Sequence, residues 1–164
     1  MKHASTPKTE TAIFAAGCFW GVEETFRTTP GVVATEVGYT GGTTEHPNYE
    51  QVCSDATGHA EAVKVEFDPS KVSYADLLKI FYANHNPTCL NYQGPDFGSQ
   101  YRSAIFFTTP DQKETAEAAK VAEEKSGRWG KPVVTQIVPA ETFYPAEDYH
   151  QKYLMKRGIR SCHL

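Results

Sequence analysis

A cysteine and a glutamate are the residues of this sequence whose types and positions most suit chemistry. Cys18 follows a short apolar segment and Gly17, where the spacing of the next apolar residues predicts the start of a helix. Unpaired backbone N–H groups and the positive end of the helix dipole meet at such a position, and both favour the nucleophilic thiolate. We therefore expect a reactive thiol. The alternative is a small buried cysteine beside two core aromatic residues.

Glu61 stands near the start of an alternating segment, on the same face as Val63, Val65 and Phe67. A carboxyl group on an apolar face is desolvated, which disfavours its charged form and raises its pKa. A carboxylic acid that is still protonated near neutral pH can act as a general acid. Two alternatives stay open: an ion pair with an Arg or Lys side chain, or a place at the frayed start of the strand.

Two long segments rich in Gly, Asn, Thr and Pro, residues 38–49 and 85–100, hold further polar candidates. Long loops in a compact chain are usually functional. Tyr49, Asp96 and Tyr101 lie in or beside them, and each could donate to a substrate oxygen or position it. For Asp96, ordinary turn chemistry is the alternative.

Two aromatic residues directly follow the cysteine. Phe19 shares a helical stripe with Val22 and Phe26, at spacings typical of an apolar helix face. Adjacent helical residues point about 100° apart, so Trp20 cannot face the same stripe. We expect Trp20 at the surface or in a cleft.

The four cysteines are Cys18, Cys53, Cys89 and Cys162. They are too few and too widely spaced for a secreted disulfide scaffold, and the absence of a Cys-x-x-Cys pair excludes a thioredoxin-type motif. Cys162 stands in the C-terminal tail, where a mobile thiol is suited to condense with a sulfenic acid formed elsewhere. An inert tail thiol is the alternative, and we interpret Cys53 and Cys89 as non-catalytic.

The six histidines offer two other kinds of chemistry. Their spacings from one another and from the cysteines match no short-range zinc motif, so we expect no metal. His59 or His150 could pair with Cys18, which would make the protein a Cys–His thiol hydrolase. Nothing in the sequence places either imidazole beside that thiol, so the hydrolase stays the alternative function.

Length and composition bound the class of protein. The chain has 164 residues, of which 40% are apolar and 22% are charged, a composition close to the globular average. A chain of this length can bury a core without metal ions or disulfide bonds. A net charge of −4 without a Lys/Arg cluster argues against a nucleic-acid partner. We see neither a signal peptide nor an apolar run near the ~20 residues of a membrane span. We expect a cytoplasmic monomer with no membrane partner.

Hydrophobic periodicity predicts strands and helices that must position these residues. Expected strands cover residues 11–16, 32–39, 61–67, 101–108 and 133–138, and expected helices cover 19–28, 73–84, 110–127 and 145–157. The first six elements follow the order β-α-β-β-α-β, the split βαβ pattern of ferredoxin-like folds. We predict an α+β fold, a two-layer α/β sandwich with helices on one face of a mixed sheet, plus extra helices and long loops.

The chain divides into three expected parts. Residues 1–10 are polar and predict a flexible N-terminal arm, residues 11–157 form a single catalytic domain, and residues 158–164 form a mobile tail that carries the candidate second thiol.

A series of motifs resembles, in order and at similar spacing, the A-type peptide methionine sulfoxide reductases. The signature is Gly-Cys-Phe-Trp-Gly at residues 17–21. The further blocks that resemble this family are Gly38–Gly42, Tyr49–Cys53, Thr57–Glu61, Asn86–Thr88, Gly98–Ser103 and Glu147–Gln151. The resemblance covers about residues 11–163, and so many ordered blocks are highly specific.

The resemblance implies a role for each matching polar residue. Cys18 would attack the sulfoxide sulfur, and Glu61 would give a proton to the sulfoxide oxygen. Tyr49 and Tyr101 would hydrogen-bond that oxygen, and Asp96 would help to shape the polar site. The implied enzyme is a peptide-methionine (S)-S-oxide reductase that repairs oxidised proteins.

The resemblance also implies how the substrate is selected. Phe19 and Trp20 would hold the methyl group of the substrate, the S epimer of methionine sulfoxide, free or in proteins. Such enzymes need neither a metal nor an organic cofactor.

A second half-reaction is implied as well. Cys18 is left as a sulfenic acid, Cys162 condenses with it, and thioredoxin reduces the disulfide. Many relatives have a glycine-rich stretch before the tail cysteine, whereas this chain has one glycine there. Because of this departure, Cys89 or Cys53 is an alternative resolving thiol.

Overall fold

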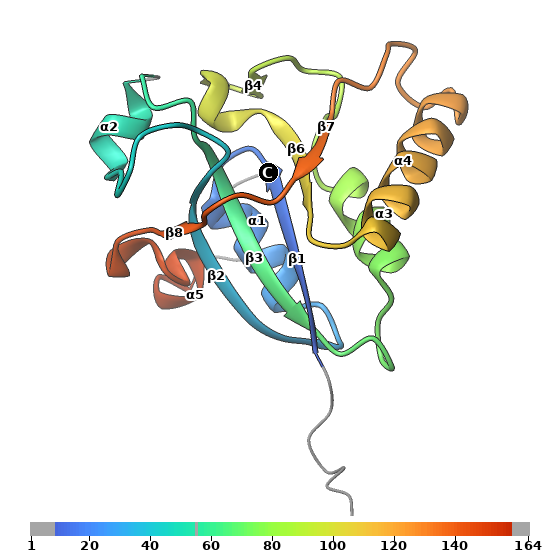
Figure 1. The fold of residues 1–164 in the computed structure, drawn as a ribbon, viewed down its shortest axis with the longest axis horizontal. Coiled ribbons are helices and arrows are strands. Elements are labelled where there is room, and N and C mark those ends of the chain that lie inside the picture. The colour runs from blue at the N-terminus through green and yellow to red at the C-terminus, as the bar shows by residue number, and fades with distance from the viewer. Residues whose placement is uncertain (1–8, 55, 159–164) are drawn as a thin grey trace, which may run out of the picture.

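The computed structural model describes residues 9–54 and 56–158 (Figure 1). In chain order its elements are β1 (Glu10–Ala16), α1 (Phe19–Arg27), β2 (Val32–Thr40), α2 (Tyr49–Cys53), β3 (Ala60–Phe67), α3 (Tyr74–Ala83), β4 (Tyr92–Gln93), β5 (Asp96–Phe97), η1 (Ser99–Tyr101), β6 (Ser103–Phe107), α4 (Pro110–Lys125), β7 (Gln136–Pro139), β8 (Tyr144–Pro145), η2 (Asp148–His150) and α5 (Tyr153–Lys156). The expected arm and tail lie largely outside the described residues. Among the described residues, no helix has the length and apolar character needed to cross a membrane.

A six-stranded mixed sheet forms the centre of the molecule, in the order β7-β6-β1-β3-β2-β8. All neighbouring strands pair antiparallel except β6 and β7, which pair parallel. The four strands β6-β1-β3-β2, with α1 and α3 as connections, have the arrangement of a ferredoxin-like βαββαβ unit. The predicted fold class is confirmed.

The main core lies between the sheet and the helices α1 and α3. Phe14 of β1 packs against Phe26 of α1 and Phe81 of α3, with ring centroids 5.1 and 5.3 Å apart. The predicted stripe of α1 is buried there, since Phe19, Val22 and Phe26 are at most 6% exposed. Burial of this stripe fixes the rotation of α1 and so the direction of the residues at its start.

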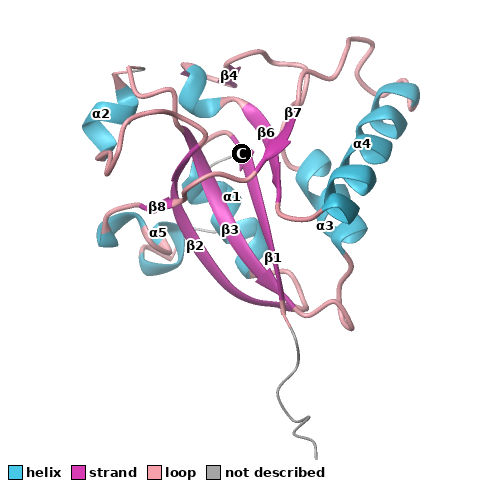
Figure 2. Cartoon of the chain, viewed as in Figure 1, coloured by secondary structure: helices cyan, strands magenta, loops and turns pink. Residues whose placement is uncertain are grey.

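The opposite face of the sheet has a thinner cover. The chain between β7 and β8 crosses in front of the sheet without forming a helix (Figure 2). Val138 of β7, together with Ala140 and Phe143 of this crossing, packs on small side chains of the sheet, among them Ala62 and Ala104. The predicted arrangement, with helices on one face of the sheet, therefore has an extended segment on the other face.

Local signals in the sequence set several helix starts correctly. Ser73 and Asp76 form the expected capping box of α3, and Pro110 occupies the first turn of α4. The sequence reasoning missed α2, a helix of five residues inside a segment expected to be a loop, which Asn48 caps with a capping box to Gln51. It also missed the small β4–β5 hairpin in the segment 85–100.

The predicted helix over residues 145–157 is wrong. Pro145 belongs to β8, a 3-10 turn follows, and only Tyr153–Lys156 is α-helical. Lys152 has a φ of 52°, a left-handed conformation that interrupts any helix. The side chain of Gln151 instead bonds both the N–H and the C=O of Val37 in β2. These tertiary hydrogen bonds outweigh the local helical periodicity.

Candidate active site

Cys18 lies in the turn between β1 and α1. Gly17 makes this turn with a φ of 98°, a conformation that side chains rarely tolerate. Cys18 is half-buried and is the N-cap residue of α1, and its carbonyl accepts the first helical hydrogen bond from Val22. The cysteine therefore stands at the positive end of the helix, as the sequence predicts.

Glu61 lies inside β3 and is 1% exposed, which excludes a place at a frayed strand end. Its Oε1 accepts a hydrogen bond from the backbone N–H of Phe19 at 3.2 Å. Phe19 is the residue after Cys18, so the carboxyl group sits at the same helix start as the thiol. The raised pKa expected for Glu61 stays a prediction.

Tyr49 and Tyr101 lie within electrostatic range of this carboxyl group. Burial raises the pKa of both tyrosines above that of an ordinary tyrosine, and Glu61 acts in the same direction when it is ionised. Both phenols therefore keep their protons and can donate hydrogen bonds. Cys53, Asp96 and Cys18 also raise the pKa of Tyr101, so these groups lie within electrostatic range of its hydroxyl.

An aromatic cluster forms the other side of the site. The ring of Phe19 is buried, 5.7 Å from Tyr39 and 5.1 Å from His150. Trp20 is half-buried, as the sequence predicts, and stacks on Tyr153 with a centroid distance of 3.7 Å and an interplanar angle of 7°. Its indole Nε1–H donates to Nδ1 of His150 at 2.8 Å.

The sequence reasoning gave Glu147 no role, yet this residue joins β2 and α2 to the segment that carries His150. Its two carboxylate oxygens accept from the hydroxyl of Tyr39 at 2.8 Å and from the backbone N–H of Tyr49 at 2.9 Å. Burial alone would raise the pKa of Glu147, but the hydrogen bonds from Tyr49 and Tyr39 lower it below the ordinary value. The only signal in the sequence was the block at 147–151, which carries both Glu147 and His150.

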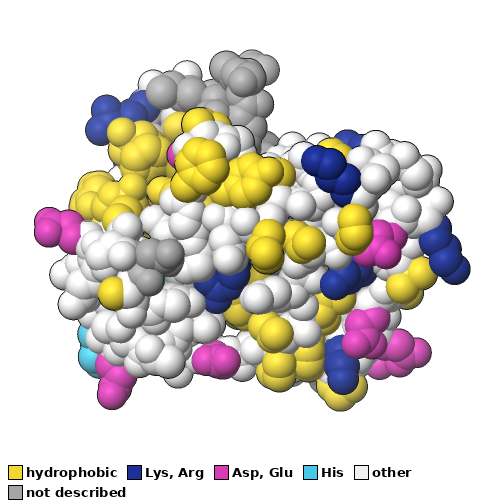
Figure 3. Space-filling model, turned by 90° about the horizontal axis from the view of Figure 1, so that it is seen from above, with side chains coloured by type: hydrophobic (Ala, Val, Ile, Leu, Met, Phe, Trp, Pro, Cys, Tyr) yellow, Lys and Arg dark blue, Asp and Glu magenta, His cyan; other side chains and the backbone are white. Residues whose placement is uncertain are grey.

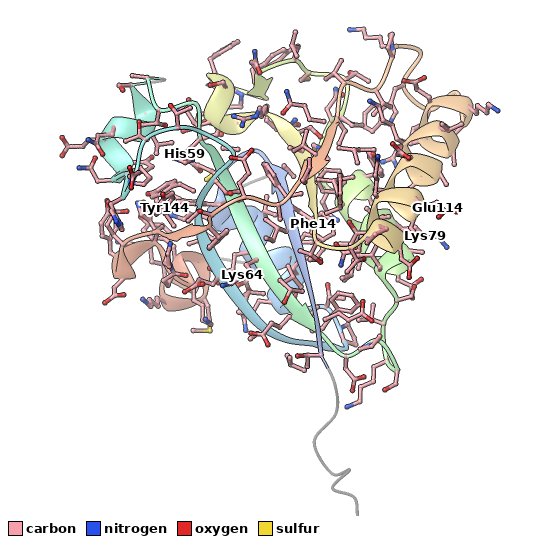
Figure 4. The ribbon with its side chains drawn as sticks, in the orientation of Figure 1. Phe14, His59, Lys64, Lys79, Glu114 and Tyr144 are labelled. Atoms are coloured by element: carbon pink, nitrogen blue, oxygen red, sulfur yellow. The ribbon has the colours of Figure 1, made fainter. Side chains whose placement is uncertain are left out.

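The two histidines of the hydrolase alternative have other partners. The ring of His59 accepts from Gly42 N–H through Nδ1 and donates to the carbonyl of Thr44 through Nε2, so both nitrogens hold the loop after β2. The ring also meets Tyr144 edge-on at 5.6 Å (Figure 4). His150 uses Nδ1 for Trp20. Neither imidazole is arranged as a base for Cys18, so the hydrolase is not favoured.

The other cysteines occupy different surroundings. Cys53 is exposed at the end of α2, where partial desolvation of its thiol raises its pKa and a hydrogen bond links it to Tyr49. Cys89 is buried and interacts with the hydroxyl of Tyr92. Cys162 lies outside the described residues. Among the described residues, no group of three or more His, Cys, Asp or Glu side chains could hold a metal ion.

Fold and site together define a class: an α+β protein with a half-buried cysteine at a helix start and a buried carboxyl group at the same helix start. Comparison with known proteins identifies the family within this class. The family model described as peptide methionine sulfoxide reductase matches residues 10–164. The chain belongs to the peptide methionine sulfoxide reductase family and is an oxidoreductase.

Individual relatives agree over nearly the whole chain. It is 59% identical over 153 residues to peptide methionine sulfoxide reductase MsrA of Geobacter sulfurreducens, covering 93% of this chain and 94% of the relative. It is 51% identical over 153 residues to peptide methionine sulfoxide reductase A2 of Arabidopsis thaliana, covering 93% of this chain and 69% of the relative.

Solved structures show the same fold. Methionine sulfoxide reductase A of Corynebacterium diphtheriae superposes with a TM-score of 0.84 at 38% identity, covering 96% of this chain and 79% of that one. Reduced Mxr1 of Saccharomyces cerevisiae gives 0.84 at 35% identity, covering 96% and 90%. Mxr1 in complex with Trx2 gives 0.60 at 26% identity, covering 93% and 89%.

Proposed function

We propose that this protein reduces the S epimer of methionine sulfoxide, free or in proteins, and that Cys18 and Glu61 are its catalytic residues. The thiolate of Cys18 attacks the sulfoxide sulfur while Glu61 protonates the sulfoxide oxygen, which is a poor leaving group until it is protonated. Tyr49 and Tyr101 donate hydrogen bonds to that oxygen as charge develops on it. Asp96 helps to shape the polar side of the site.

The hydrogen bond from Phe19 N–H to Glu61 is the single observation that carries this proposal. At 3.2 Å it holds a carboxyl group that is 1% exposed directly beside the residue that follows Cys18. A nucleophile and an acid can then act on adjacent atoms of one small substrate group. An acyl transfer reaction in which a histidine acts as the base does not need this carboxyl group.

The first half-reaction moves one oxygen atom. The attack forms a bond between the sulfur of Cys18 and the sulfoxide sulfur. The protonated oxygen then passes to the sulfur of Cys18, as this sulfur–sulfur bond and the sulfur–oxygen bond of the substrate both break. Cys18 is oxidised by two electrons to a sulfenic acid, and the sulfoxide sulfur is reduced by two electrons to the thioether of methionine. The oxygen comes from the substrate and the proton on it comes from Glu61, whose carboxylate is reprotonated in place of the proton that Cys18 released, and no metal or organic cofactor takes part.

The second half-reaction returns the enzyme to its thiol form. Cys162 attacks the sulfenic acid, a disulfide to Cys18 forms, and water leaves. Tyr153 of α5 stacks on Trp20, so the last described helix is docked beside the start of α1. The segment from Gly158 to Cys162 is short, and a chain of that length spans at most about 14 Å. This supports Cys162 as the resolving thiol in a tail that follows the catalytic domain.

Thioredoxin is the proposed reductant, since the solved relative Mxr1 forms a complex with Trx2. It reopens the disulfide by thiol–disulfide exchange. The four cysteines are too few and too widely spaced for a secreted disulfide scaffold, which suits a reducing compartment. We place the protein in the cytoplasm as a monomer.

Phe19 and Trp20 are the proposed wall for the substrate methyl group, and this wall selects the epimer. Protein-bound substrate is supported by apolar side chains outside the site. Exposed hydrophobic residues of the segments that carry Asp96 and His150 are Leu90, Phe97, Tyr149 and Met155. The molecule seen from above shows clusters of hydrophobic side chains between its charged groups (Figure 3).

Substitution of the two proposed catalytic residues tests the function. Cys18→Ser abolishes reduction of the S epimer, because a hydroxyl replaces the nucleophilic thiolate. Glu61→Gln keeps the shape and lowers turnover by about 10²–10⁴-fold, the usual contribution of a general acid. Full activity of the Cys18 variant, or an unchanged rate in the Glu61 variant, would overturn the proposed mechanism.

A further inference from the structure

We propose that His150 is a positioning residue for this reaction, which holds the indole of Trp20 in the orientation that receives the substrate methyl group. The inference rests on the proposed function, because the methyl-binding role of Trp20 is part of it. In this role His150 acts through Trp20 and not on the reacting atoms.

His150 is fully buried at the centre of the aromatic cluster, with an exposed fraction of 0%. Its ring centroid lies 5.1 Å from Phe19, 5.7 Å from Trp20, 4.5 Å from Tyr49 and 4.1 Å from Tyr149. A buried imidazole needs hydrogen-bond partners, and the indole supplies one at 2.8 Å. The bond joins the first turn of α1 to the segment around η2.

The hydrogen bond fixes the tautomer of His150. An indole N–H is only a donor, so Nδ1 of His150 must be an unprotonated acceptor. The imidazole proton then sits on Nε2, which lies 3.9 Å from Oε1 of Glu147. This carboxylate is itself held by Tyr39 and Tyr49 and favours a proton on the nitrogen that faces it. Burial also lowers the pKa of His150, although the charge of Glu147 acts in the opposite direction. The lowered pKa keeps the ring neutral, so Nδ1 remains an acceptor.

Stacking alone does not fix the indole. Trp20 stacks almost parallel on Tyr153, at 3.7 Å and 7°. A half-turn about the Cβ–Cγ bond of Trp20 keeps the plane of the indole, and torsions of this kind have broad, roughly two-fold preferences. The half-turn would carry Nε1 away from His150 and break the hydrogen bond. The directional bond therefore specifies which edge of the indole faces His150, which a parallel stack on Tyr153 does not.

The selected orientation matters for substrate binding. A methyl wall that is already in place lowers the ordering cost of binding and excludes the epimer whose methyl group points elsewhere. Loss of His150 is therefore expected to raise KM and weaken epimer selection, while kcat changes little because Cys18 and Glu61 remain.

Two variants separate the ring of His150 from its acceptor. His150→Phe keeps a buried ring without an acceptor, whereas His150→Asn loses the ring and keeps a carbonyl oxygen near the place of Nδ1. For the S epimer, we expect kcat/KM to fall about tenfold in the Phe variant, mostly through KM, and to return to within about threefold of wild type in the Asn variant. A loss confined to kcat, or an equal loss in both variants, would overturn the inference.

The indole signals provide a readout that is independent of turnover. The chain has two tryptophans, so its NMR spectrum holds two indole N–H signals. Trp129 donates to Oε2 of Glu123 at 2.7 Å and serves as the internal reference. The Trp20 signal shifts and exchanges faster in the Phe variant, and the Trp129 signal stays. An unchanged Trp20 signal in that variant contradicts the proposal.

The wild-type protein gives a test that needs no variant to fold. Side-chain ¹⁵N shifts of His150 must report a neutral ring with the proton on Nε2, and a proton on Nδ1 would overturn the inference. These spectra do not depend on activity, whereas Cys18→Ser tests the proposed function without touching the indole bond. A failure of the positioning role of His150 can therefore be distinguished from a failure of the proposed function.

Discussion

Glu23 holds the C-terminal segment against α1, and its loss should loosen the site. The side chain is 1% exposed, and it accepts from the hydroxyl of Thr35 at 2.8 Å and from the backbone N–H of Lys152 at 2.6 Å. Lys152 has the left-handed φ of 52° and directly precedes Tyr153, which stacks on Trp20. Glu23→Ala leaves two donors without an acceptor, at about 1–3 kcal/mol each, or roughly 2–6 kcal/mol together.

Thermal unfolding and steady-state kinetics measure this effect. In a domain of about 150–250 residues, 1 kcal/mol corresponds to about 2–4 °C, so the lower bound already lowers Tm by about 4–8 °C. We also expect a higher KM, since Tyr153 and His150 lose their anchor. If the segment detaches locally before the domain unfolds, the change appears first as faster amide exchange at Leu154.

The neighbouring glutamate offers a matched control. Glu24 stands on the same helix and forms an i,i+3 ion pair at 2.8 Å with Arg27, whose side chain is 29% exposed and can turn to water when Glu24 is removed. Such pairs contribute about 0.2–1 kcal/mol, so Glu24→Ala should lower Tm by no more than about 2–4 °C and leave KM unchanged. Equal effects of the two substitutions, or an unchanged KM in Glu23→Ala, would refute the anchoring role.

Three further predictions concern acid stability, substrate contact and recycling. The pKa of Glu147 is lowered in the folded protein, so its contribution to stability is present above the ordinary glutamate pKa of ~4.3 and is lost as pH falls through the lowered value. When the free energy of unfolding is measured from pH 6 downwards, Glu147→Gln should therefore show a smaller loss of stability toward acid pH than the wild type. Phe97 is 73% exposed, so Phe97→Ser should lower kcat/KM about threefold or more for sulfoxide peptides with apolar flanking residues, but not for free methionine sulfoxide. Val121→Ser, on α4 and 50% exposed, is its control, and a loss with the free substrate would count against surface contact. Cys162→Ser should allow one turnover and stop thioredoxin-driven cycling, and sustained cycling would transfer the resolving role to another cysteine.

The sequence was sufficient where neighbours along the chain decide the structure. Gly17 and the stripe of Phe19 and Phe26 predict the strand, turn and helix that carry Cys18, and these elements form as expected. Alternation places Glu61 on a buried face, and the structure buries it. The capping box of α3 likewise marks a helix start correctly.

The sequence was insufficient where distant partners decide. Residues 145–157 have helical periodicity, but Gln151 bonds to Val37 and Lys152 to Glu23, each more than a hundred residues away. No local pattern reports such bonds. The same segment brings His150 to Trp20, so the part of the site that sequence reasoning missed is the part built by these long-range contacts.

Counting free thiols before and after one equivalent of methionine sulfoxide tests the central claim most directly. The reduced protein has four cysteines. With the S epimer, we predict the loss of two thiols per chain, as the oxidised Cys18 closes its disulfide, and no loss with the R epimer. Four thiols remaining after the S epimer has been added would contradict the claim that Cys18 takes the oxygen.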